Sequence, residues 1–495
     1  MEILYQSTRG NGERITASQA ILNGIATDGG LYVPTQVPAF DRPVSAFAGL
    51  SYKETAFAVL KQFLTDYTDE ELTACIDGAY NDKFDTPKIA PLHEAAGAFY
   101  LELYHGPTIA FKDMALSILP HLMTTAARKS GLTDEIVILT ATSGDTGKAA
   151  LEGFADVPGT RIVVFYPKHG VSAIQERQMV TQKGDNTCVI GIEGNFDDAQ
   201  TGVKRIFTDE GVRKTLADKG FRFSSANSIN IGRLVPQIVY YVYSYATLLA
   251  EKKIKDGEPV NIVVPTGNFG NILAAYYAMQ MGLPVRKLVC ASNENKVLYD
   301  FFGTGTYDRN RPFILTSSPS MDILISSNLE RLIYHIAGDN AETDRALMAK
   351  LLSEGKYAIT DSMREKLSMF VGGFATEEET KEEIARVYRE AGYLIDTHTA
   401  VASAVYRRYR EQSGDETPAI IASTASPYKF TRAVTEALGI ETQGADDFAL
   451  VGRLSEKTGI PVPAAVSSLE TASIRHDTVC EVEEMEDGVK RFLGI

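Results

Sequence analysis

The sequence predicts an α/β protein built from two open sheets of mostly parallel strands. Short apolar runs rich in β-branched residues, as at residues 136–141, alternate with segments of helical pattern. This alternation is typical of parallel sheets covered by helices. The chain of 495 residues is also too long for one hydrophobic core, so we expect more than one domain.

Residues 1–90 are predicted to form a separate N-terminal segment. The motif Asp28-Gly-Gly-Leu-Tyr-Val-Pro34 marks a turn into an extended stretch, and helical patterns follow at residues 53–64 and 69–80. No grouping of catalytic side chains is visible in this segment.

Residues 91–230 are predicted to form a smaller α/β domain. We expect strands at residues 136–141, 161–166 and 187–192, and a helix at residues 174–183. The strand segments are almost continuously apolar, as in parallel strands that are buried on both faces.

Residues 231–495 are predicted to form the larger α/β domain. Residues 302–327 are rich in Gly, Thr, Ser, Arg and Pro, which indicates an irregular insertion, and the charge-dense residues 377–390 indicate a solvated helix. The regular elements expected here are strands at 260–264, 287–291 and 419–423 and helices at 234–253 and 272–281.

Composition narrows the class of partner. A net charge of −15 argues against nucleic acid or an anionic membrane as the main partner. Four scattered cysteines and seven histidines without ligand spacing predict reduced thiols and no metal site. No apolar stretch has the length of a membrane span, and the first residues lack an export pattern, so we expect a cytoplasmic protein.

Lys112 is the candidate nucleophile. It lies in His105-Gly-Pro-Thr-Ile-Ala-Phe-Lys-Asp113, among apolar and small residues before an expected helix. An apolar environment disfavours the charged ammonium, so the pKa falls and the amine can attack an aldehyde. A lysine that extends from an amphipathic helix into solvent would have the same local sequence, so the rest of the chain must decide.

Three polar loops follow expected strands, where open α/β sheets bind ligands. The loop at residues 267–271 opens a helix whose free amides suit a phosphate, although a purely structural turn is as plausible. The loop at residues 143–148 is no nucleotide P-loop, because Ala141 and Ala149 replace the required glycine and hydroxyl residue. The third loop, residues 224–230, is followed by Arg233, which offers a fork for an oxyanion or a surface charge beside a helix cap.

One candidate amine and several anion-binding loops, without a metal site or Ser-His-Asp spacing, are what pyridoxal phosphate requires of a protein. At these motifs the chain resembles the threonine synthases, a family of fold type II pyridoxal phosphate enzymes. The motifs that carry the resemblance are Tyr5-Gln-Ser-Thr-Arg9, Asp28 to Pro34, Leu101 to Asp113, Leu139 to Gly147, Ser225 to Asn230, Pro265 to Gly270 and Thr424 to Phe430.

The resemblance implies that Lys112 carries the cofactor as a Schiff base and transfers protons at Cα. It implies an activity that converts O-phospho-L-homoserine and water to L-threonine and phosphate. Asp145 would lie near the 3-hydroxyl of the cofactor and Thr424 would face its pyridine nitrogen. The implied cofactor-binding residues are Lys112, Asp145, Gly267, Asn268, Phe269, Gly270, Asn271 and Thr424. The implied substrate-binding residues are Ser143, Thr146, Asn227, Ser228 and Arg233.

Three alternatives stay open at this point. A serine or threonine dehydratase of the same fold would share Lys112 but would need no second phosphate site. A catalytically silent homologue would bind only cofactor or a partner. An α/β dehydrogenase is disfavoured, because no Gly-x-Gly-x-x-Gly turn follows a strand. We expect a monomer or homodimer that acts on a small molecule.

Overall fold

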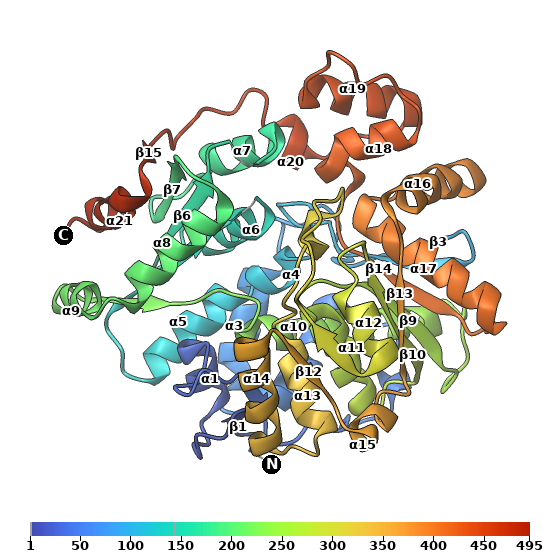
Figure 1. Ribbon diagram of the computed structural model, residues 1–495, viewed down its shortest axis with the longest axis horizontal. Coiled ribbons are helices and arrows are strands. Elements are labelled where there is room, and N and C mark those ends of the chain that lie inside the picture. The colour runs from blue at the N-terminus through green and yellow to red at the C-terminus, as the bar shows by residue number, and fades with distance from the viewer. Residues whose placement is uncertain (1, 143, 170) are drawn as a thin grey trace.

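Two separate sheets organise the molecule, the larger toward the lower right of Figure 1 and the smaller toward the upper left. The computed structural model describes residues 2–142, 144–169 and 171–495 of the chain. The larger sheet has the strand order β13 (Phe370–Phe374), β10 (Val285–Ser292), β9 (Val260–Pro265), β14 (Ala419–Ser423), β4 (Ala98–Glu102) and β3 (Leu92–Ala95). The smaller sheet has the order β15 (Val479–Cys480), β7 (Thr187–Ile192), β6 (Thr160–Pro167), β5 (Glu135–Ala141) and β8 (Phe221–Ser224).

The strand pairing is parallel in both sheets except between β3 and β4, which form an antiparallel hairpin. Every residue of β9 and of β14 is buried, as expected for central strands with helices on both faces. The fold class predicted from the sequence is therefore confirmed. Two short antiparallel pairs lie outside the sheets: β1 (Tyr5–Ser7) with β2 (Tyr32–Pro34), and β11 (Thr306–Asp308) with β12 (Lys356–Ala358).

Helix α10 (Ile231–Ala250) lies at the centre and is buried over most of its circumference. Burial of each of its large apolar side chains contributes roughly 1.5–3 kcal/mol. The helices toward the N-terminal side are α1 (Ala17–Asn23), α2 (Tyr52–Phe63), α3 (Asp69–Ala79), α4 (Asp113–Leu116), α5 (Leu119–Lys129), α6 (Asp145–Phe154), α7 (Ala173–Val180), α8 (Phe196–Thr208) and α9 (Glu210–Asp218). Those that follow α10 are α11 (Gly270–Gln280), α12 (Val297–Thr304), α13 (Leu329–Ile336), α14 (Ala341–Glu354), α15 (Asp361–Glu365), α16 (Glu377–Ala391), α17 (Thr397–Ser413), α18 (Thr431–Ala437), α19 (Asp447–Thr458), α20 (Ala464–Ser467) and α21 (Met485–Leu493).

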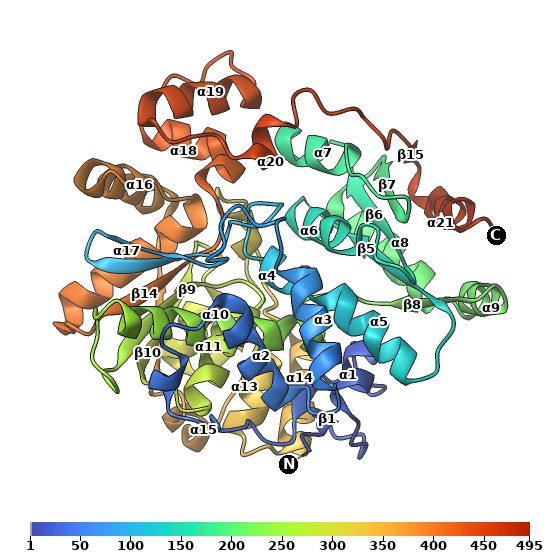
Figure 2. The same cartoon turned by 180° about the vertical axis from the view of Figure 1, so that it is seen from behind.

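The N-terminal segment packs on this central helix. Figure 2 shows α2 and α3 in blue in front of α10, and α2 packs directly against it. Ser51 and Thr68 begin these two helices with capping boxes closed by Glu54 and Glu71, which satisfy amides that would otherwise lack partners. The segment is thus part of the core around the site rather than an appended arm.

Two strand pairings cross the domain boundary that the sequence predicts at residue 231. Strand β4, which precedes Lys112, pairs with β14 and so belongs to the larger sheet, not the smaller one. Strand β15 near the C-terminus pairs with β7 of the smaller sheet, because the chain returns over α7 after α19 (Figure 1). Lys112 therefore follows a strand of the larger sheet, and the boundaries themselves remain a prediction.

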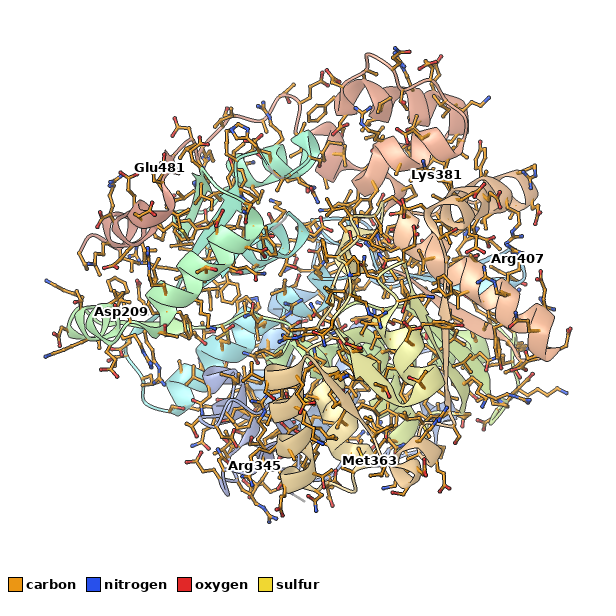
Figure 3. The ribbon with its side chains drawn as sticks, in the orientation of Figure 1. Asp209, Arg345, Met363, Lys381, Arg407 and Glu481 are labelled. Atoms are coloured by element: carbon orange, nitrogen blue, oxygen red, sulfur yellow. The ribbon has the colours of Figure 1, made fainter. Side chains whose placement is uncertain are left out.

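Charged side chains lie on the surface, and the cysteines are unpaired. Charged side chains such as Asp209, Lys381 and Glu481 lie at the periphery in Figure 3. All four cysteines are free thiols. Within the described ranges of the chain, no helix combines the length and apolar character needed to cross a bilayer.

Candidate active site

Lys112 lies at the junction of β4 and α4, in a segment held by the end of β14. The amide of Phe111 donates to the carbonyl of Thr424 (2.8 Å), and Ser426 donates to the carbonyl of Ile109 (3.0 Å). Ile109 has φ 52°, a left-handed conformation that a β-branched residue adopts only at a cost of about 1–3 kcal/mol. Such strain, held by neighbouring structure, is typical of functional sites.

The Lys112 amine lies in a buried polar contact. Only 9% of the residue is exposed, and Nζ donates to Ser320 Oγ at 3.0 Å, with Asp145 Oδ2 at 3.7 Å. Burial lowers the pKa of Lys112, an effect that Asp145 opposes and that the charges of Lys429 and Arg233 reinforce. The burial and lowered pKa that the sequence reasoning attributes to this lysine are therefore present.

Asp145 is the first residue of α6, directly after Gly144, which has φ 137°. Its carboxylate accepts from Gln175 Nε2 (3.0 Å) and pairs with Lys429 Nζ at 3.4 Å. Burial raises the pKa of Asp145, but Lys429, Lys112 and the Gln175 amide together hold it well below its ordinary value. Asp145 is therefore an anion beside the Lys112 amine.

The loop at residues 267–271 connects β9 to α11. Phe269 has φ 65° and stands at the N-cap of α11, and a Cβ on Gly267 would come within 2.4 Å of the Ser320 carbonyl oxygen. The first amides of α11 have no carbonyl four residues back within the helix. In the described part of the chain, the buried Asn271 Nδ2 also finds no hydrogen-bond partner.

These features fit the phosphate of pyridoxal phosphate. Free amides, the positive end of a helix and an unpartnered amide donor are suited to bind a phosphate, and the Lys112 amine is the group that an aldehyde requires. Asn268 and Gly270 complete this loop, and the Asn268 carbonyl accepts from the Asn328 amide (3.0 Å). Among the residues that the structure describes, no group of three or more His, Cys, Asp or Glu side chains is arranged to hold a metal ion.

Arg233 is buried in the first turn of α10, with 5% of its surface exposed. One of its terminal nitrogens donates to the carbonyl of Ala226 (3.0 Å), while Nε has no partner among the described residues. Burial lowers the pKa of Arg233 to about 10, so it stays a cation at neutral pH. A buried guanidinium with an unpaired N–H is suited to bind an oxyanion.

The other predicted site residues lie in the turns and helix ends around these groups. Asn227 is exposed and Ser228 is half-buried in the turn before α10, where the Ser228 carbonyl accepts from Asn328. Thr146 is half-buried in the first turn of α6, and Thr424 is buried beside Phe111. Ser143 lies outside the described residues.

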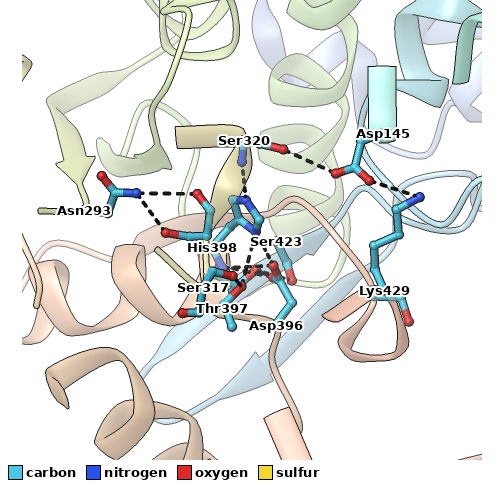
Figure 4. Close-up of polar contacts among 12 residues, drawn as sticks. Asp145, Asn293, Ser317, Ser320, Asp396, Thr397, His398, Ser423 and Lys429 are labelled. Carbon is cyan, nitrogen blue, oxygen red and sulfur yellow. Dashed lines mark hydrogen bonds and ion pairs between the residues drawn. The ribbon is translucent and has the colours of Figure 1, made fainter. Parts of the chain in front are cut away.

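Four residues of this constellation escaped sequence analysis: Ser320, Lys429, Asp396 and His398 (Figure 4). Ser320 lies in the irregular stretch at residues 302–327, which has no periodicity to guide a prediction. Lys429 is fully buried and donates to Gln178 Oε1 (3.0 Å). Its position within the motif from Thr424 to Phe430 was a signal that could have identified it. In the sequence, Asp396 resembles an ordinary helix cap. His398 lies two residues after it, so neither residue indicated a functional site.

Three family models cover most of the chain. They are described as Threonine synthase N terminus (residues 4–80), Pyridoxal-phosphate dependent enzyme (residues 84–424) and Threonine synthase, C-terminal (residues 399–489). The three segments follow the order of the N-terminal segment, the two sheets and the helices around α18 and α19.

Individual relatives agree with the family models. The chain is 40% identical to threonine synthase of Pseudomonas aeruginosa over 88% of this chain and 90% of that protein. It is 41% identical to human threonine synthase-like 1 over 86% of this chain, and it spans only 58% of that longer relative. The crystal structure of PLP-bound threonine synthase from Brucella melitensis superposes with a TM-score of 0.88 at 36% identity, covering 99% of both chains.

Proposed function

Because the chain belongs to the threonine synthase family of pyridoxal-phosphate-dependent enzymes, we propose that it converts O-phospho-L-homoserine and water to L-threonine and inorganic phosphate. The observation that carries the proposal is the joint presence of a buried amine at Lys112 and two separate sites for anions. One anion site is the start of α11, and the other surrounds Arg233. A dehydratase would need only the first of these sites.

Pyridoxal phosphate, when bound, supplies an electron sink for the electron pair released as the Cα–H bond of the substrate breaks. The amides of residues 267–271 and the side chain of Asn271 would hold the cofactor phosphate. Lys112 would hold the cofactor covalently through its amine, and the same amine would move the proton at Cα of the substrate. Asp145 and Thr424 would hold the ring of the cofactor.

The substrate is held at both of its anionic ends in this proposal. Thr146, in the first turn of α6, and Ser143, which the sequence adds to the site, contact its carboxylate or phosphate. Arg233, with Asn227 and Ser228, binds the γ-phosphate and stabilises it as it departs. The hydroxyl that enters at Cβ comes from water, so the products are threonine and phosphate.

The activity is tested by incubating purified protein with pyridoxal phosphate and O-phospho-L-homoserine. We expect release of phosphate and formation of threonine in equal amounts. Ammonia and a keto acid from serine or threonine as the main products would instead identify a dehydratase. Borohydride reduction of the cofactor-loaded protein should label wild type at Lys112 and leave Lys112→Ala unlabelled, and a colourless wild type would contradict the cofactor assignment.

The role of Arg233 is tested by Arg233→Ala. Loss of one charge-assisted contact of about 1.5–3 kcal/mol predicts a KM for O-phospho-L-homoserine raised roughly 10- to 150-fold, with the Kd for pyridoxal phosphate within threefold of wild type. Arg222→Ala, an exposed arginine on neighbouring β8, serves as the matched control. Equal weakening of both affinities would contradict the assignment.

A cytoplasmic location is part of the proposal, supported by the four free thiols. The oligomeric state, monomer or homodimer, stays a prediction that sedimentation would decide.

A further inference from the structure

The contact between Lys112 and Asp145 contains a third group. Ser320 Oγ accepts from Lys112 Nζ at 3.0 Å and donates to Asp145 Oδ2 at 3.3 Å, while Nζ and Oδ2 stay 3.7 Å apart. The last distance exceeds the 2.7–2.9 Å of a charge-assisted hydrogen bond. The hydroxyl therefore bridges the two charged groups and keeps them from direct contact.

This separation matters for an amine that must react. An opposite charge nearby favours the protonated form of a lysine, and only the unprotonated amine attacks an aldehyde. Four charged groups act on Lys112: Asp145 from α6, Lys429 from the turn after β14, Arg233 from α10 and the adjacent Asp113. Of these, Asp145 shares a hydrogen-bond partner with the amine, so its distance is the variable that Ser320 controls.

The turn that carries Ser320 is held by the first turn of α17. It is a 3-10 turn, Pro319–Met321, whose Ser320 amide donates to His398 Nε2 at 3.1 Å. His398 Nδ1 donates in turn to Asp396 Oδ2 at 2.9 Å, and both side chains are buried. Asp396 also caps α17 through the amides of His398 and Thr399. Figure 4 shows this chain from Asp396 through His398 and Ser320 to Asp145.

The loop that begins at Gly267 packs closely against the same turn. The close approach of the Ser320 carbonyl to Gly267 leaves no room for a side chain there. Asp145 is held independently by Gln175 and Lys429. Both ends of the bridge are therefore anchored, so the hydroxyl stays between the carboxylate and the amine.

We propose that Ser320 is a catalytic residue whose hydroxyl keeps the Lys112 amine out of direct contact with Asp145 and so keeps its nitrogen available, with His398 and Asp396 as the positioning residues. The inference rests on the proposed role of Lys112 as the cofactor-binding amine. It needs no redox step and no bond to Ser320.

The expected effect of removing the hydroxyl follows from the distances. In Ser320→Ala the amine and the carboxylate close from 3.7 Å to about 2.8 Å, which at an effective dielectric constant of about 20 favours the ammonium by about one pH unit. The half-maximal rate of Schiff-base formation should shift to higher pH by that amount. Ser320→Thr, which retains a hydroxyl, should behave as wild type.

The test uses cofactor-free full-length protein mixed with pyridoxal phosphate, with the rate of Schiff-base formation followed by visible absorbance across pH. Ser317→Ala is the matched control, because this hydroxyl lies on the same segment and contacts Glu377 instead. In the Asp145→Asn background, Ser320→Ala should cause no upward shift, since the carboxylate charge is gone. His398→Phe should shift the profile in the same direction as Ser320→Ala and accelerate hydrogen exchange at the Ser320 amide.

The outcomes separate the two proposals. If wild type forms no borohydride-reducible adduct at Lys112, both the proposed function and this inference fail. If wild type forms the adduct but Ser320→Ala and His398→Phe keep the wild-type profile, only the inference fails. An upward shift that persists unchanged in the Asp145→Asn background would also overturn it.

Discussion

Replacement of Asp344 by asparagine should stabilise the protein at neutral pH but hardly at pH 4. Asp344 lies in the first turn of α14, is fully buried, and neither carboxylate oxygen has a hydrogen-bond partner in the described part of the chain. Burial and the nearby Glu330 raise the pKa of Asp344 to about 9. The positive charge of Arg9 opposes this rise in pKa, but its guanidinium donates its hydrogen bonds to Glu330 and not to Asp344.

The size of the effect follows from linkage between protonation and folding. The native protein holds a proton on Asp344 that the unfolded chain releases near its ordinary pKa of about 3.9. Below that pKa, Asp344 is protonated in both the native and the unfolded state, so it does not make the free energy of unfolding depend on pH. Above it, stability is lost with rising pH at about 1.4 kcal/mol per unit until the native pKa near 9 is reached. At pH 7 the loss is up to about 4 kcal/mol.

Asparagine cannot ionise, so Asp344→Asn removes this loss. With an unfolding entropy of about 2.1 cal/mol/K per residue, a shift of about 1 °C in Tm corresponds to each kcal/mol in a chain of this length if unfolding is cooperative. Calorimetry should therefore show a Tm gain that grows to about 4 °C between pH 4 and pH 7. The exposed Glu342→Gln on the same helix is the control, with no pH-dependent gain expected. A gain for Asp344→Asn of equal size at both pH values would refute the reasoning, because it would not come from ionisation.

Two further perturbations concern the site. Gly267→Ala should weaken pyridoxal phosphate binding at least tenfold by absorbance titration, because its Cβ would meet the Ser320 carbonyl oxygen at 2.4 Å; Gly303→Ala, with open space around it, should bind as wild type. Lys429→Met leaves Asp145 as a buried anion without its nearest cation and should cost about 3–5 kcal/mol, or roughly 3–5 °C in Tm. The surface variant Lys381→Met should change Tm by less than about 1 °C, and equal losses for both lysines would contradict the argument.

Elements with strong apolar runs were predictable, and those that depend on tertiary contacts were not. The strand predicted at residues 136–141 corresponds to β5, and the helix predicted at residues 377–390 corresponds to α16. A strand that is buried on both faces has a continuous apolar run, and a helix with a solvated face has a regular spacing of charges, so both leave a clear pattern in the sequence. The β3–β4 hairpin was missed because its turn places Ala96 and Gly97 at positive φ. Such turns favour Asn or Asp before the glycine, and alanine gives no such signal.

The residues of the site also fall into a group that the sequence could predict and a group that it could not. Lys112 and the loop that begins at Gly267 are local motifs, so their chemistry could be inferred from neighbours in the chain. Ser320 and His398 come into the site from residues about 200–290 positions away from Lys112, and only the three-dimensional structure brings them there. Sequence periodicity carries no information about such pairings.

The late position of β14 in the chain has a consequence for biosynthesis. This strand lies between β4 and β9 in the larger sheet, yet about 320 residues separate the end of β4 from the end of β14. At roughly 5–20 residues per second, the ribosome needs about 15–65 s to span that interval. During this time β4, and β9 once it has been synthesised, each present an unpaired edge, which is prone to aggregation. The strand that supports Lys112 thus waits for its partner until translation is nearly complete, so a nascent chain stalled before residue 419 cannot assemble the site.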